Sequence, residues 1–177
     1  DTWVSIVCTY HSPLQHLNEY LHGEKYKRKL KQNRKQSIKL LRSAQKFIAK
    51  VLSHGGRAAF ELPAENELWK DPEWMKFEAD HSMKRVFFNG CSFNLRGKGG
   101  ELIKKPWAVS TSDMRLIQIL DQHKCSGDHQ HEPAMGGNAA HTAYYTPEWR
   151  QRFSRPFIRI SFTVPFHQFS MVQPLSL

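Results

Sequence analysis

The stretch RKQSIKLLRSAQKFIAKVLSHGGRAAFEL, residues 34–62, decides the expected fold. Apolar residues recur along residues 34–53 at the spacing of one helix face, and lysines and arginines fall between them. The pattern predicts a helix that ends at Gly55 and Gly56, because glycine accepts the left-handed conformation found just beyond many helix ends. The apolar run RAAFEL that follows is typical of a buried strand.

A second apolar run, TWVSIV at Thr2–Val7, precedes this stretch and predicts another buried strand. Strand, helix and strand in this order form a crossover unit that joins parallel strands, so we expect an α/β fold. The expected architecture is a partial Rossmann-like parallel sheet at residues 1–80. A smaller, irregular region that carries cysteine and histidine follows at residues 81–153, and a tail with one edge strand at residues 154–177.

The segment between the first strand and the helix is polar. We expect a loop at Cys8–Asn18, because the segment contains Pro13 and several polar residues. Residues 19–33 are either a mobile loop or the beginning of the helix.

Composition narrows the class of protein. The chain has 177 residues, of which 40% are hydrophobic and 12% aromatic, and this excludes a wholly disordered chain. No apolar run approaches the roughly 20 residues of a membrane helix, and the N-terminus lacks the pattern of a signal peptide. Three cysteines, an odd number, favour a reducing, intracellular setting over a disulfide framework, with the nucleus as one option. The chain does not begin with Met, and we expect it to be a piece of a larger protein.

The positive charge is concentrated in one segment. The formal net charge is +10, and residues 21–50 hold eight lysines and three arginines against the single acid Glu24. Such a segment attracts polyanions, which predicts DNA or RNA as a partner. A solvated helix face and an acidic partner protein remain the alternatives. The candidate contacts with nucleic acid are Lys25, Lys27, Arg28, Lys29, Lys31, Arg34 and Lys35.

A second basic set consists of Lys104, Lys105, Trp107 and Arg96. Lysines beside an exposed tryptophan suit contacts with the phosphate backbone and stacking of a base. The alternative is a core tryptophan whose neighbouring lysines protect an edge strand from aggregation.

Cys8 and Glu61 each lie at the C-terminal end of a predicted strand. Parallel neighbours present these ends at the same edge of a sheet, where open α/β sheets bind their ligands. We therefore expect the thiol and the carboxylate to face one crevice. The alternatives are a buried structural thiol and a surface glutamate that caps a turn.

These segments resemble cytosine-C5 DNA-methyltransferase-like Rossmann domains, and more closely a divergent group associated with mobile elements. The first motif of that group is approximately Ser-Pro-Pro-Cys-Thr-x-x-Ser-x-Leu-Gln-x-Leu-Asn. The matching residues here are Ser5, Cys8, Thr9, Ser12, Leu14, Gln15, Leu17 and Asn18. The later motifs Glu-x-Pro, Gly-Cys, Lys-Pro-Trp and Cys-x-x-x-His-x-His are matched by Glu61 and Pro63, Gly90-Cys91, Lys105-Pro106-Trp107 and Cys125 to His131. The resemblance covers about residues 1–150.

The resemblance implies that Cys8 is the nucleophile that attacks C6 of cytosine and that Glu61 holds the N3 edge of the ring. The base would have to be flipped out of a duplex to reach them. Two departures stand out: Ile6 and Val7 replace the prolines before the cysteine, and the Gly-rich loop for S-adenosylmethionine belongs upstream of Asp1. The expected function is a nucleic-acid-binding, methyltransferase-like domain fragment with S-adenosylmethionine supplied by another part. The alternative is a non-enzymatic, zinc-stapled DNA- or RNA-binding module of a mobile-element protein.

Cys91, Cys125, His129 and His131 form a candidate metal site. Two thiolates and two imidazoles are a sufficient ligand set for tetrahedral zinc. The spacing of Cys125, His129 and His131 is compact, although no Cys-x-x-Cys pair is present. The alternative is a polar, His-rich loop that faces phosphate or solvent.

Overall fold

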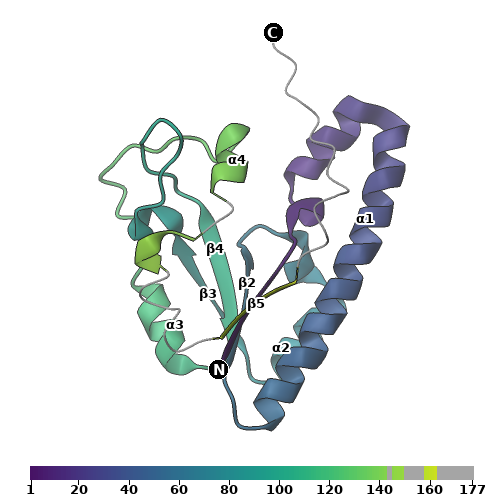
Figure 1. Ribbon diagram of the computed structural model, residues 1–177, viewed down its shortest axis with the longest axis vertical. Helices are drawn as coiled ribbons and strands as arrows, with labels where there is room; N and C mark the ends of the chain where they lie inside the picture. Colours follow the sequence, from purple (N-terminus) through teal and green to yellow (C-terminus); the bar gives the residue numbers. More distant parts are fainter. Residues whose placement is uncertain (143–144, 150–157, 163–177) are drawn as a thin grey trace.

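The computed structural model describes residues 1–142, 145–149 and 158–162, and within them the chain forms a five-stranded sheet flanked by helices (Figure 1). The strands are β1 (Thr2–Ile6), β2 (Ala58–Pro63), β3 (Lys84–Asn89), β4 (Pro106–Thr111) and β5 (Ile158–Phe162). The α-helices are α1 (Leu14–Ser53), α2 (Pro72–Asp80), α3 (Met114–Asp121) and α4 (Gly137–His141). The short 3-10 helices are η1 (Thr9–His11), η2 (Glu67–Lys70) and η3 (Gly90–Phe93).

The sheet is mixed, with the strand order β3-β4-β2-β1-β5. β1 pairs in parallel with β2 and with β5, whereas β4 is antiparallel to both β2 and β3. The α/β class and the crossover through α1 are thus confirmed, and β5 is the edge strand expected in the tail. The parallel pairing expected within residues 1–80 is present in β1 and β2. The complete sheet is mixed, because the β3–β4 connection contains no crossover helix and returns the chain in the opposite direction.

The helix begins earlier than the sequence suggested. α1 starts at Leu14 and includes residues 19–33, so the predicted loop at Cys8–Asn18 was wrong beyond Pro13. Proline tolerates the first turn of a helix, and the segment is rich in good helix formers. Gly23 has φ 65° and ψ −159°, a conformation open to glycine, and divides α1 into two arms. Figure 1 shows the change of direction near the top of the view.

Two apolar cores lie on the two faces of the sheet. Neighbouring residues of a strand point to opposite faces, so Trp3 enters one core and Val4 the other. α1 and α2 cover the second face, where the buried side chains include Leu41, Ile48, Phe60 and Trp74. α3 covers the first face and contributes Leu116 and Leu120. Among the described residues, no helix combines the length and the apolar character of a membrane span.

Leu41→Ala tests the packing of α1 against the sheet. Leu41 is fully buried, so its truncation is expected to lower the free energy of unfolding by about 2–5 kcal/mol. Leu21 lies on the same helix with 61% of its surface exposed, and Leu21→Ala is expected to change stability by no more than about 0.5 kcal/mol. Urea denaturation measures both variants, and equal losses would contradict this packing.

Candidate functional site

The structure brings Cys8 and Glu61 to neighbouring strand ends. β1 and β2 are adjacent and parallel, Ser5 lies opposite Glu61, and Cys8 follows Ser5 by three residues, beyond the end of β1. The carbonyl of Cys8 accepts a hydrogen bond from Asn66 Nδ2 at 2.8 Å, which holds the loop after β1. The expected arrangement of adjacent, co-directional strands is confirmed, whereas the catalytic roles of the two residues stay predictions.

Two further residues join this pair. Glu61 is buried and accepts a hydrogen bond from the hydroxyl of Tyr145, which itself accepts one from Trp3 Nε1 at 3.2 Å. The Lys105 ammonium donates to the carbonyl of Thr142 at 2.7 Å and interacts electrostatically with Cys8 and Glu61. We use the name thiol pocket for the group of four side chains Cys8, Glu61, Lys105 and Tyr145, with no cavity implied. Cys8 packs against the second core, and Glu61 contacts Tyr145 of the first core. No local pattern pointed to Tyr145, which follows a long loop.

The environment of the thiol pocket shifts the ionisation of two groups. Burial, and then the negative charge of Glu61, raises the pKa of Cys8 to about 11, although Lys105 acts in the opposite direction. Burial lowers the pKa of Lys105, whereas Glu61 and Cys8 oppose that change. The Cys8 thiol is therefore protonated near neutral pH.

Of the two interpretations of the second basic set, the structure bears out the core tryptophan. The Trp107 side chain is 3% exposed and packs in the core beside Phe88 and Tyr145, so it offers no platform for a base. Lys105 belongs to the thiol pocket and is not a solvated phosphate contact. Lys104 and Arg96 are the exposed members of this set. The cause is the position of Trp107 within β4, where alternate side chains face a core.

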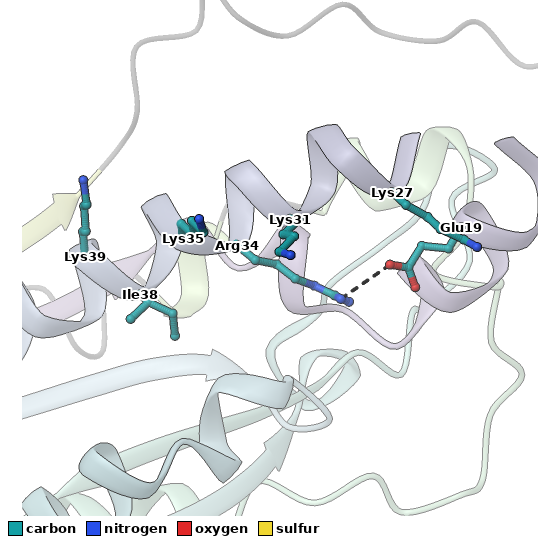
Figure 2. Close-up of a pocket in the computed structure, with 7 residues that line it drawn as sticks. All are labelled: Glu19, Lys27, Lys31, Arg34, Lys35, Ile38 and Lys39. Atoms are coloured by element: carbon teal, nitrogen blue, oxygen red, sulfur yellow. Dashed lines mark ion pairs between the residues drawn. The ribbon is translucent and has the colours of Figure 1, made fainter. Parts of the chain in front are cut away.

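A cationic groove runs along α1 (Figure 2). Its volume is about 700 Å³, and five of its seven lining side chains are basic. The lining residues are Glu19, Lys27, Lys31, Arg34, Lys35, Ile38 and Lys39. Lys25, Arg28 and Lys29 are exposed on the same helix but do not line the groove. The structure therefore gathers four of the seven predicted contacts into one concave surface.

Arg34 connects the groove to the thiol pocket. Its Nε donates to the carbonyl of Tyr10 at 3.0 Å, and Tyr10 lies two residues after Cys8. The guanidinium also forms ion pairs with Glu19 and Glu67, each at 3.6 Å. These contacts connect the groove with Tyr10 in η1, two residues after Cys8, and with Glu67 in η2.

Cys91, Cys125, His129 and His131 lie together, with one ligand atom of each within 4.8 Å of the others. The Cys125 Sγ is 3.4 Å from His131 Nε2 and 3.7 Å from His129 Nε2. Bond lengths to zinc imply separations of roughly 3.3–3.8 Å between the ligand atoms of a tetrahedral site. The four residues, which we call the Cys/His cluster, can hold a metal ion.

Neighbouring groups orient the Cys/His cluster. Asp128 Oδ1 lies 2.8 Å from His129 Nδ1, and a proton on Nδ1 leaves Nε2 free to face Cys125. Asn89 Oδ1 accepts from the backbone N–H of Cys125 at 2.9 Å. Burial, and then contact with the Cys125 thiol, raises the pKa of Cys91 to about 11.

Comparisons of the chain with family models, with curated proteins and with solved structures found no match. The candidate sites therefore rest on the geometry of the thiol pocket, the cationic groove and the Cys/His cluster.

Proposed function

We propose that this chain is a nucleic-acid-binding domain whose thiol pocket receives an unstacked pyrimidine base, in the manner of cytosine-C5 methyltransferase-like Rossmann domains. One observation carries the proposal: Arg34, which lines the cationic groove, donates a hydrogen bond to the carbonyl of Tyr10, two residues after Cys8. In this proposal a strand of DNA or RNA held in the groove runs past the loop after β1 and presents a base to Cys8.

The groove supplies the affinity in this proposal. Lys27, Lys31, Lys35 and Lys39 line it from one helix, and Glu19 is the one acid in the lining. Basic side chains release condensed counterions from a phosphate backbone, which makes binding strong at low salt and weak at high salt. The exposed Lys25, Arg28 and Lys29 would widen this surface.

The thiol pocket supplies the base chemistry. The Cys8 sulfur adds to C6 of the ring, and the electron pair of the C5–C6 double bond moves toward C5, which takes up a proton. The thiol proton is released, so this addition balances and is reversible. Glu61, held by the Tyr145 hydroxyl, contacts the N3 edge, and the Lys105 ammonium stabilises the thiolate.

S-adenosylmethionine does not fit the described residues. None of β1–β4 is followed by a Gly-rich turn that opens an α-helix, which is the usual cradle for such a cofactor. The proposed chemistry therefore ends at the reversible addition of the thiol.

The raised pKa of Cys8 supports a second candidate function, a non-enzymatic DNA- or RNA-binding module. A thiol that stays protonated near neutral pH is a weak nucleophile. In this alternative Cys8 and Glu61 only pack in the interior. The cationic groove alone binds the nucleic acid.

Exchange of the hydrogen at C5 of cytosine distinguishes the two candidates. Addition of Cys8 to C6 labilises that hydrogen, so an oligonucleotide deuterated at C5 is expected to lose its label in the presence of the protein. Cys8→Ser is expected to abolish the exchange and to retain binding of the same oligonucleotide. Mass spectrometry follows the label, and exchange at the same rate with Cys8→Ser would exclude the nucleophilic role.

The Cys/His cluster is best suited to zinc. Zinc accepts mixed thiolate and imidazole ligands in a tetrahedral site, and four protein ligands leave no open position. The ion would join Cys91, which follows β3, to three ligands that follow α3. Its role in the proposal is therefore structural.

A further inference from the structure

A chain of hydrogen bonds leads away from the Cys/His cluster. Glu132 follows the cluster residue His131 and accepts from Asn138 Nδ2 at 2.9 Å. It also accepts from the backbone N–H of Glu101 at 2.9 Å. Gly97 leaves the space that this carboxylate needs, because a Cβ there would collide with Glu132 Oε2. The side chain of Asn138 is therefore tied to Glu132, which directly follows the cluster residue His131.

Hydrogen bonds also connect Asn138 to the thiol pocket. The carbonyl of Asn138 accepts from the backbone N–H of Thr142 at 2.9 Å and from its hydroxyl at 2.7 Å. Thr142 is 1% exposed, and its own carbonyl accepts the hydrogen bond from the Lys105 ammonium at 2.7 Å. The Lys105 ammonium, which interacts electrostatically with Cys8, is thus connected to Asn138 through Thr142.

A second route joins the cluster to Lys105 through the backbone. The N–H of Gly90 donates to the carbonyl of Lys105 at 2.8 Å, and Gly90 directly precedes Cys91. Packing there is close, since a Cβ on Gly90 would lie 2.5 Å from Leu95 Cδ2. Both segments that contribute to the Cys/His cluster therefore converge on Lys105.

We propose that the Cys/His cluster controls the reactivity of Cys8, and that Asn138 is the positioning residue that transmits this control by holding Thr142 beneath Lys105. An ion in the cluster fixes the segment from Cys125 to Thr142, and Lys105 then stays beside the thiol. Without the ion, or without the Asn138 side chain, Lys105 leaves and the thiol loses its nearby positive charge. The inference rests on the metal site proposed above.

The rate of Cys8 alkylation tests the proposal. The full chain, loaded with zinc or treated with a chelator, is reacted with iodoacetamide at mildly alkaline pH, and peptide mass spectrometry reports each cysteine separately. Chelation is expected to slow alkylation of Cys8 by about 3- to 10-fold, because a nearby charge shifts a thiol pKa by about one unit. Cys91 and Cys125 are expected to react faster under the same treatment.

Three variants test whether Asn138 and Lys105 transmit the effect of zinc to Cys8. Lys105→Met and Asn138→Ala are each expected to react slowly at Cys8 with or without zinc. Glu101→Ala removes an exposed carboxylate from the neighbouring loop, keeps the backbone contact with Glu132, and is expected to respond to chelation as the unaltered chain does. The proposal is overturned if chelation slows alkylation of Cys8 equally in Lys105→Met and in the unaltered chain. It is also overturned if chelation leaves the rate of Cys8 alkylation unchanged in the zinc-loaded, unaltered chain. If the unaltered chain binds no zinc by metal analysis, the metal site fails and this inference fails with it.

Discussion

Cys125→Ser is expected to abolish stoichiometric zinc binding, whereas Cys8→Ser leaves it intact. Cys125 lies 3.4 Å and 3.7 Å from the two histidine nitrogens, so its loss removes the ligand in contact with both. Loss of a group behind the ligands typically costs about 10- to 100-fold in metal affinity, and loss of a ligand costs more. We therefore expect the affinity to fall by more than about 100-fold, measured by competition with a chromophoric chelator.

The two cysteine variants form a matched pair. Each replaces one sulfur by oxygen, but only Cys125 belongs to the cluster. Zinc at about 1,000 times its Kd would add about 4 kcal/mol to the free energy of unfolding, and a chelator would remove this stabilisation. For a chain of this size the change corresponds to about 8–16 °C in Tm. An identical zinc content in both variants, or an unaltered Tm on chelation of the zinc-loaded chain, would contradict the structural metal site.

Reversal of two charges in the groove, Lys31→Glu with Lys35→Glu, is expected to weaken oligonucleotide binding by about 10- to 100-fold. One charge pair in water contributes on the order of 1 kcal/mol, and a glutamate adds repulsion. The dependence of affinity on salt should also become shallower, by about one unit of slope for each phosphate that is no longer neutralised. Fluorescence anisotropy with a labelled single-stranded oligodeoxynucleotide measures both effects.

Lys46→Glu with Lys50→Glu is the matched control. These lysines lie on the same helix with the same spacing, are exposed, and change the net charge equally, but they do not line the groove. We expect the control to retain most of the affinity. Equal losses in the two double variants would show that net charge governs binding and would leave the groove without a specific role.

Much of the fold could be predicted from local patterns in the sequence. The apolar stripe of residues 34–53 and the glycines after it predict the helix, and two short apolar runs predict β1 and β2. The crossover rule then makes these strands parallel, which places Cys8 and Glu61 at one sheet edge. The compact spacing from Cys125 to His131 likewise suffices to predict a shared ligand cluster.

Contacts between distant segments decided the rest. Lys105, Thr142 and Tyr145 reach the thiol pocket from β4 and from the segment after α4, and no local pattern relates them to Cys8. The reversal of β4 and the choice between a core and an exposed Trp107 could not be settled from the sequence for the same reason, because strand direction and the choice of face depend on which strand pairs alongside. Periodicity is a property of neighbours in the chain, whereas these features are properties of neighbours in space.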